Sequence, residues 1–321
     1  MPQAFIFPGQ GSQAAGMGRS LAEAYPVARY VFQEVDDALN QPLSRLMFEG
    51  PDEELTLSEN AQPAQLTVSM AVVRVLEERF GTLLTEQARF FAGHSLGEYS
   101  ALTAAGALPI ADAVRLVRAR GRAIQEAAPP GKGAMAAIIG LSLDEVREVA
   151  AEAASDDEVC QVANDNAPAQ VVVSGHSGAV ARAENIARAR GAERVVRLAV
   201  SLPFHSPLAA PAAETVERLL ADIELVEPRL PIVANVTATP QDQPDAIRRR
   251  LVEQVTETVR WRESVEFMRD RGVDLLVELG GTSVLTALVQ QIDPTLEGRF
   301  VGSPRDVEAY FDAAVTQERA P

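Results

Sequence analysis

Residues 90–101 read Phe-Phe-Ala-Gly-His-Ser-Leu-Gly-Glu-Tyr-Ser-Ala and contain the pattern Gly93-x-Ser95-x-Gly97. An apolar run precedes the pattern and a helix-compatible stretch follows it, an arrangement that places a serine on a tight turn between a strand and a helix. Flanking glycines permit a strained backbone and a close approach of strand and helix. Ser95 would then lie at a helix N-terminus, where unpaired N–H groups stabilise an oxyanion. Five-residue patterns recur by chance, but this context favours a nucleophilic serine over an ordinary turn.

Strands and helices alternate on both sides of this turn. A short apolar strand at 4–7 runs into a glycine-rich turn, and helical spacing of apolar residues follows at 27–39, at 64–80 after Pro63, and at 111–128. The alternation predicts an α/β fold in which helices pack over a parallel sheet.

The pattern changes between residues 128 and 200. The elements expected there are strand 133–141, helix 142–154, strand 159–163, a turn at 164–168, strand 170–174, helix 179–190 and strand 194–200. Ser142 and Glu145 stand in capping-box register at the start of the first helix. The order βαββαβ is that of a ferredoxin-like unit. We therefore expect a small subdomain at 128–200, inserted in a large α/β lobe formed by 1–127 and 201–321.

Composition narrows the class of protein. With 321 residues, 47% of them hydrophobic, the chain can bury a core large enough for two lobes. The net charge of −16 argues against nucleic acid and anionic membranes as partners. A single cysteine, Cys160, excludes an internal disulfide and a cysteine-based metal cluster. The N-terminus has no basic segment before its short apolar run, and no apolar stretch reaches membrane-spanning length, so we expect a cytoplasmic enzyme without a metal.

A serine nucleophile needs a base, and the chain has three histidines. His94 precedes Ser95, so its side chain should point away from the hydroxyl, and a packing role is expected. His176 follows a predicted strand and is interpreted as part of a surface turn. His205 lies between two prolines where the chain returns from the small subdomain to the large lobe, and ligand sites form in such clefts. By elimination, His205 is the candidate base, neutral near pH 7.

Arg120 falls on the buried side of the helix predicted at 111–128. It lies between Leu116 and Ile124, four residues away on either side, in the apolar stripe. A guanidinium that faces inward needs an anionic partner. Two interpretations stay open from the pattern: a structural salt bridge with a buried carboxylate, or a fork that binds the free carboxylate of a substrate.

Several stretches are longer and more specific than the serine pattern: FPGQGSQ at 7–13, NAQPA at 60–64, GHSLGEYSAL at 93–102, RGRAIQEAAPPGKGAMAAIIGL at 120–141, NDNAPAQVVVSG at 164–175, PFHS at 203–206 and EQVTETVRW at 253–261. In this order they resemble malonyl-CoA:acyl carrier protein transacylase, the enzyme that loads malonyl units for type II fatty acid synthesis. The resemblance covers nearly the whole chain, to about residue 292.

The resemblance implies a role for six residues. Ser95 matches the nucleophile that becomes malonyl-serine, and His205 matches its base. Arg120 matches the arginine that binds the malonyl carboxylate. The backbone N–H groups of Gln10 and Leu96 match the oxyanion hole, and the backbone carbonyl of Gln254 matches the group that orients the histidine in place of a triad aspartate.

The family also implies a fold, substrates and a partner. Its fold is an α/β-hydrolase-like lobe with a ferredoxin-like insert, in agreement with the order of elements expected from the pattern. Malonyl-CoA is the expected donor and the pantetheine thiol of acyl carrier protein the expected acceptor, with no cofactor, no metal and a monomeric enzyme. The turn Gly280-Gly281-Thr282-Ser283 departs from the family's usual Gly-Pro/Ala-Gly-Lys.

Other functions stay open at this point. A serine thioesterase would use water in the second half-reaction and has no obvious use for an inward Arg120. Chain order does not exclude Asp156, Asp157 or Asp165 as the acid of a hydrolase triad. A stand-alone polyketide acyltransferase and the malonyl-transfer subunit of malonate decarboxylase share the same dyad. A non-catalytic scaffold that binds acyl carrier protein is disfavoured, because nucleophile, base and fork are all present.

Overall fold

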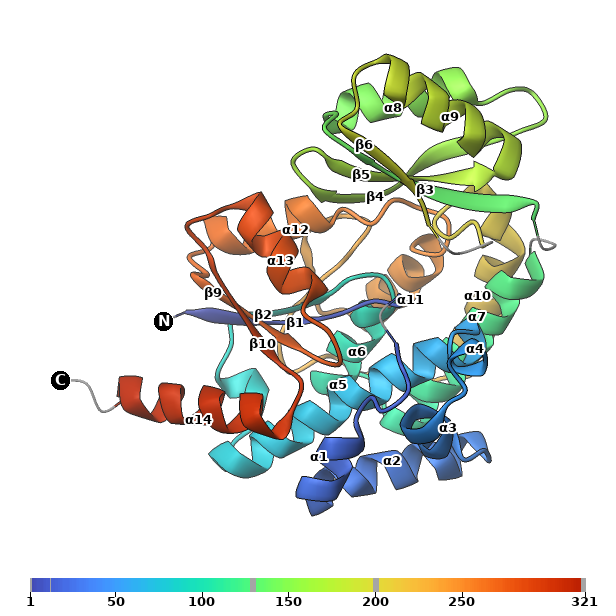
Figure 1. Ribbon diagram of the computed structural model, residues 1–321. Coiled ribbons are helices and arrows are strands. Elements are labelled where there is room, and N and C mark those ends of the chain that lie inside the picture. Colours follow the sequence, from blue (N-terminus) through green and yellow to red (C-terminus); the bar gives the residue numbers. More distant parts are fainter. Residues whose placement is uncertain (1, 12, 128–130, 199–201, 319–321) are drawn as a thin grey trace.

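The computed structural model describes residues 2–11, 13–127, 131–198 and 202–318, which form two β-sheets (Figure 1). The larger sheet has six strands in the order β10-β9-β1-β2-β7-β8. Neighbouring strands in this sheet are parallel, except that β7 and β8 are antiparallel to each other. The strands are β1 Gln3–Phe7, β2 Phe90–Gly93, β7 Ile232–Val233, β8 Pro240–Gln241, β9 Leu275–Leu279 and β10 Glu297–Val301.

Helices cover both faces of the larger sheet. In β1, Phe5 and Phe7 belong to the core beneath α5 and α7, whereas Ala4 and Ile6 belong to the core beneath α12 and α13. Because alternate residues of a strand face opposite sides, an all-apolar strand can support both layers. The helical elements of this part are α1 Arg19–Ala24, α2 Pro26–Leu39, α3 Leu43–Glu49, α4 Asp52–Leu55, α5 Ser58–Phe80, η1 Leu84–Glu86, α6 Leu96–Ala104, α7 Ile110–Ala127, η2 Pro207–Ala209, α10 Ala210–Ala221, α11 Pro244–Glu253, α12 Trp261–Asp270, α13 Val284–Ile292 and α14 Pro304–Glu318.

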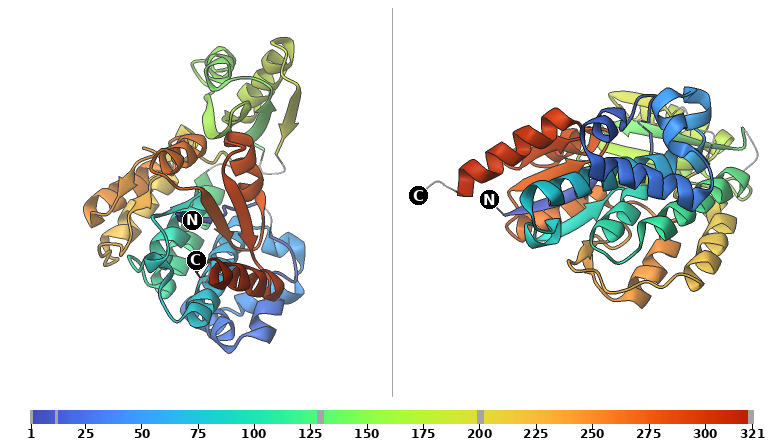
Figure 2. Two further views of the ribbon diagram at one scale, coloured as in Figure 1. Left: turned by 90° about the vertical axis from the view of Figure 1, so that its left-hand side faces the viewer. Right: turned by 90° about the horizontal axis from the view of Figure 1, so that it is seen from below.

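The second sheet is antiparallel, in the order β4-β5-β3-β6, and it stands with its helices at one end of the molecule (Figure 2). Its elements are β3 Gly133–Ile139, α8 Leu143–Ala153, β4 Cys160–Ala167, β5 Gln170–His176, α9 Ser177–Ala189 and β6 Arg194–Arg197. This order confirms the ferredoxin-like unit. The capping box of Ser142 and Glu145 at the start of α8 is also confirmed.

The predicted domain division remains a prediction. Its boundaries, at residue 128 and at residues 200 and 201, lie outside the described residues, as do the last residues of the strand predicted at 194–200. None of the described helices is long and apolar enough to cross a membrane.

The predicted start of the helix at 64–80 is wrong. Helix α5 begins at Ser58 and contains Pro63. A proline removes one hydrogen bond of the helix, but the first turns of α5 are buried, and a Cβ on Gly121 of α7 would lie 2.4 Å from the Ser58 carbonyl oxygen. Packing against α7 therefore extends the helix ahead of the proline.

The turn predicted at 164–168 is also wrong. Asn164 and the three residues after it belong to β4, and the turn is confined to Pro168 and Ala169. The chain stays extended because Asn164, Asp165 and Ala167 continue the antiparallel pairing with β5, and Asn164 also forms a parallel bridge with Val259. A neighbouring strand thus overrides the local preference of asparagine and aspartate for turns.

The C-terminal segment, which carries no sequence motif, is part of the large lobe. β10 extends the larger sheet beside β9, and α14 follows it. Val307 and Tyr310 of α14 are buried in the same core as Phe5, and the Tyr310 hydroxyl donates to Gln3 Oε1 at 2.8 Å.

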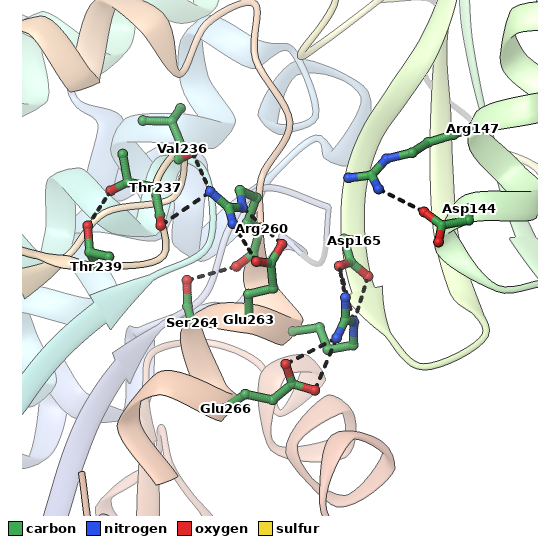
Figure 3. Close-up of polar contacts among 11 residues, drawn as sticks. Asp144, Arg147, Asp165, Val236, Thr237, Thr239, Arg260, Glu263, Ser264 and Glu266 are labelled. Atoms are coloured by element: carbon green, nitrogen blue, oxygen red, sulfur yellow. Dashed lines mark hydrogen bonds and ion pairs between the residues drawn. The ribbon is translucent and has the colours of Figure 1, made fainter. Parts of the chain in front are cut away.

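An ion pair joins the small sheet to the large lobe. Asp165 of β4 is 1% exposed, and its Oδ2 accepts from Nη2 of Arg262 in α12 at 2.8 Å. Arg262 also contacts Glu266, and Figure 3 draws both contacts. This pair holds the edge strand β4 against α12, close to the segment that carries Gln254.

Candidate active site

Ser95 lies at the sharp turn from β2 into α6, as the sequence predicts. Its backbone has φ 52° and ψ −108°, a strained conformation for a residue other than glycine. A Cβ on Gly93 would lie 1.9 Å from the carbonyl of Gly97, and a Cβ on Gly97 would lie 2.0 Å from the carbonyl oxygen of Phe7. Only glycine fits these two positions, so the contact between strand and helix enforces the turn that presents the Ser95 hydroxyl.

The Ser95 hydroxyl oxygen lies 2.8 Å from Nε2 of His205. The other ring nitrogen, Nδ1, lies 2.7 Å from the backbone oxygen of Gln254. Because a carbonyl only accepts, Nδ1 carries the ring proton and Nε2 can accept the proton of the hydroxyl. Burial, followed by the charge of Arg120, lowers the pKa of His205 to about 3, so the imidazole is neutral at neutral pH. The two residues singled out as nucleophile and base thus lie in direct contact.

Arg120 is buried beside them, at 1% exposure. Its Nη1 donates to Gln62 Oε1 at 2.8 Å, and its Nη2 donates to Gln254 Oε1 and to Ser95 Oγ, both at 3.2 Å. Within the described residues, no carboxylate lies in ion-pair distance of the guanidinium, and its Nε has no partner. The direct salt bridge that the sequence left open is therefore not formed there, and the positive charge faces the serine hydroxyl.

Gln10 and Leu96 lie on the two segments that flank the serine. Gln10 follows β1, and its amide nitrogen donates to Ser58 Oγ at 2.9 Å. Leu96 is the first residue of α6. Within the described part of the chain, neither backbone N–H forms a hydrogen bond, which for Leu96 is usual in the first turn of a helix. Both are free to donate to a ligand, and their role as an oxyanion hole remains a prediction.

Asn235 is a site residue that the sequence did not reveal. Its side-chain oxygen accepts from the backbone N–H of Ser95 at 2.7 Å, and its side-chain nitrogen donates to the Gly93 carbonyl at 2.6 Å. It thus spans the strained turn. No local signal marks Asn235, because it follows the short strand β7, 140 residues from Ser95. Gln62, also missed, stands in a stretch that carried the family resemblance.

The other two histidines do not reach the serine. His94 contacts Asn166 Oδ1 through Nε2 at 2.8 Å and stacks edge-on against Trp261, which confirms a packing role. The interpretation of His176 as part of a surface turn is wrong. It ends β5, and its Nδ1 accepts from the backbone N–H of Val159 at 2.9 Å.

Among the residues that the structure describes, no triad acid approaches His205. Asp165 pairs with Arg262, while Asp156 and Asp157 are exposed in the small subdomain. The described residues also hold no cluster of three or more His, Cys, Asp or Glu side chains suited to a metal ion.

A strained serine, a neutral histidine and a buried arginine define a site for acyl transfer, and comparisons with known proteins agree. The family model described as "Acyl transferase domain" matches residues 4–306. A relative from Bacillus subtilis (strain 168), named malonyl CoA-acyl carrier protein transacylase, is 43% identical over 305 residues, which is 95% of each chain. The chain belongs to the family of malonyl CoA-acyl carrier protein transacylases.

Solved structures extend the likeness to three dimensions. The acyl-carrier-protein-S-malonyltransferase of Bartonella henselae is 47% identical, with a TM-score of 0.94 over 98% of this chain and 99% of that one. A malonyl-transacylase solved with a type II polyketide synthase acyl carrier protein is 41% identical, with a TM-score of 0.94 over 98% of this chain and 100% of that one.

Proposed function

We propose that this chain moves the malonyl group from malonyl-CoA to the pantetheine thiol of acyl carrier protein and so supplies fatty acid synthesis. The observation that carries the proposal is the contact of Arg120 Nη2 with Ser95 Oγ at 3.2 Å, in a buried site. A buried positive charge beside a nucleophile suits an acyl group that itself ends in a carboxylate.

The proposed reaction runs in two half-reactions. His205 takes the proton of Ser95 as the hydroxyl oxygen attacks the thioester carbonyl of malonyl-CoA. The N–H groups of Gln10 and Leu96 stabilise the oxyanion, and loss of one such donor costs about 3 kcal/mol of barrier. The intermediate collapses to malonyl-serine, and the CoA thiolate leaves with the proton from His205. The thiol of acyl carrier protein then attacks malonyl-serine by the same steps in reverse.

In this proposal Arg120 also provides selectivity. The malonyl carboxylate would pair with the guanidinium, whose Nε has no partner in the described structure. Acetyl-CoA would leave the buried guanidinium without a carboxylate in direct contact, and such a loss costs about 3 kcal/mol or more. The carbonyl of Gln254 takes the place of a triad acid at His205 Nδ1, which suits an activated thioester better than an amide.

Two alternatives differ mainly in the acceptor. A serine thioesterase would need water, and a buried Arg120 has no evident role in hydrolysis. A stand-alone polyketide acyltransferase has the same chemistry with another carrier protein, and the malonyl-transfer subunit of malonate decarboxylase is comparable. We favour fatty acid synthesis because the curated relatives carry the plain name malonyl CoA-acyl carrier protein transacylase. We further propose a cytoplasmic monomer that uses no cofactor beyond its substrates.

Intact-protein mass spectrometry tests the proposal directly. Wild type, Ser95→Ala and Arg120→Ala are each mixed with malonyl-CoA or acetyl-CoA. We expect a malonyl adduct on the wild type, little acetyl adduct, and no adduct on Ser95→Ala. Malonyl labelling of Arg120→Ala as fast as that of the wild type would contradict the role of the arginine. Prompt loss of the adduct to water, with no acceleration by added carrier protein, would favour the thioesterase.

A further inference from the structure

Glu98 is a buried carboxylate at the site that the proposed reaction steps do not use. It lies in the first turn of α6 and is 1% exposed. Its carboxylate accepts from the Asn235 backbone N–H at 3.1 Å, from the Gln254 amide at 2.8 Å and from the Gln241 amide at 3.0 Å. All three partners are donors, which is the arrangement that an ionised carboxylate requires.

Gln254 connects this carboxylate to Arg120. Its amide nitrogen donates to Glu98 at 2.8 Å, and its amide oxygen accepts from Arg120 Nη2 at 3.2 Å. An amide has one donating end and one accepting end, so the carboxylate on one side decides which end faces the guanidinium. Glu98 and Arg120 are thus opposite charges bridged by a single amide.

This arrangement offsets the unfavourable free energy of burying the Arg120 guanidinium. A buried guanidinium without any counter-charge is unfavourable. Burial lowers the pKa of Arg120, and the neighbouring Tyr99 and Glu98 oppose that change. Burial in turn raises the pKa of Glu98 to about 7, and the Arg120 charge is among the groups that oppose this shift.

We propose that Glu98 is the resident counter-charge of Arg120, relayed by the Gln254 amide, and that it moderates the affinity of Arg120 for the malonyl carboxylate. The inference rests on the proposed function, in which Arg120 binds that carboxylate. Because the bridge occupies the Gln254 side of the guanidinium, it leaves other N–H groups for the substrate. The malonyl group must leave the site in the second half-reaction, so a moderated affinity favours turnover. Glu98 acts through Gln254 and is a positioning residue.

The test measures binding in a Ser95→Ala background, where malonyl-CoA is not consumed. In Glu98→Gln the new amide oxygen can accept from Asn235 and Gln254. Gln241, whose amide oxygen has no partner in the described residues, can turn to accept from the new amide nitrogen. At about pH 8, where Glu98 is ionised, we expect Glu98→Gln to bind malonyl-CoA about tenfold more tightly in calorimetry. Binding of acetyl-CoA should not change.

Glu278 offers a matched control. It is fully buried, it accepts from the N–H groups of Leu285 and Thr286, and burial raises its pKa to about 7 as well. It lies in β9, its carboxylate faces the start of α13, and it has no contact with Arg120. Glu278→Gln should leave the affinity for malonyl-CoA unchanged.

The pH dependence of binding gives a second readout. Around Arg120, the pKa of Tyr99 is raised to about 12 and that of His205 is lowered to about 3, while burial lowers the pKa of His94. Asn235, Gln241 and Gln254 do not titrate. Between about pH 8.5 and about pH 6, protonation of Glu98 should tighten the binding of malonyl-CoA relative to acetyl-CoA. The Glu98→Gln protein should show no such change.

The two hypotheses fail in different ways. Unchanged or weaker binding of malonyl-CoA by Glu98→Gln would overturn the role of Glu98 as a counter-charge, since a merely structural residue gives no gain in affinity. Failure of the proposed function would appear in the Ser95→Ala protein itself, which would then bind malonyl-CoA no better than acetyl-CoA. In that case Arg120→Ala would change neither affinity.

Discussion

His205 can act as a base only while its ring is neutral, and its surroundings keep it so. The ring is buried beside the positive charge of Arg120, which lowers the pKa of His205 to about 3. The Gln254 carbonyl then selects the tautomer in which Nε2 accepts from Ser95. At the scale of single residues, the environment of each polar group therefore decides its chemistry.

This environment predicts the pH profile of the reaction. Because the pKa of His205 is lowered, the base stays deprotonated until the pH falls toward about 3, and kcat/KM for malonyl transfer should not decline between about pH 8 and about pH 5. Steady-state rates with malonyl-CoA and carrier protein check this. Glu98→Gln, measured in parallel, removes the other group that titrates in this window. A half-loss of kcat/KM near the ordinary histidine pKa of about 6.5 would contradict the profile.

At the scale of elements, the site depends on how closely α6 approaches the end of β2. Gly93 and Gly97 allow backbone to contact backbone at this turn, and Asn235 ties the turn to the segment after β7. The strained φ of Ser95 is sustained by these contacts and not by its own sequence preference.

Gly93→Ala should abolish this contact. The added Cβ would lie 1.9 Å from the Gly97 carbonyl, and backbone cannot yield as a flexible side chain can. We expect a loss of about 3 kcal/mol or more in the free energy of unfolding, measured by chemical denaturation. Gly281→Ala is the control, because its Cβ would have no neighbour nearer than 3.6 Å, and it should cost less than about 0.5 kcal/mol. Equal stability of the two variants would show that the turn is not the constraint described.

At the scale of the whole molecule, polar contacts along β4 join the small sheet to the large lobe. Asp165 in the small subdomain pairs with Arg262 in the large lobe, and Asn164 bridges to Val259. Asn166, in the same strand, contacts His94 next to the nucleophile. The position of β4 is thus coupled to the site through neighbouring residues.

Arg262→Ala should destabilise the protein by about 2 kcal/mol near pH 7, because it leaves the buried Asp165 carboxylate unpaired. Burial already raises the pKa of Asp165, and Arg262 opposes that shift. A carboxylate whose pKa is raised in the folded state destabilises the protein as the pH rises and the carboxylate ionises. The stability deficit of Arg262→Ala should therefore shrink as the pH falls from about 7 to about 5. Chemical denaturation of the variant and the wild type at both pH values measures this difference in the free energy of unfolding. Arg147→Ala is the control, since Arg147 and Asp144 form an exposed pair with side chains 59% and 86% accessible, and it should cost less than about 0.5 kcal/mol. A deficit independent of pH would contradict the electrostatic explanation.

Prediction from sequence succeeded where a signal is local. The capping box at Ser142 and the turn at Ser95 are each specified by residues a few positions apart. It failed at Pro63 and at 164–168, because packing of α5 on α7 and pairing of β4 with β5 and Val259 override local preference. The C-terminal β10 and α14 lack a motif. The place of β10 comes from pairing with β9, and that of α14 from the burial of Val307 and Tyr310 in the core.

The amino-acid sequence by itself determined the order of elements in the ferredoxin-like unit, the serine turn and the inward face of Arg120, because these follow from spacing along the chain. The tertiary structure alone decided which groups surround that charge. Asn235 and Gln254 reach Ser95 from 140 and 159 residues away, and Gln254 places the Glu98 carboxylate behind Arg120. Contacts at such separation depend on how the whole chain packs, since no local pattern of residues encodes them.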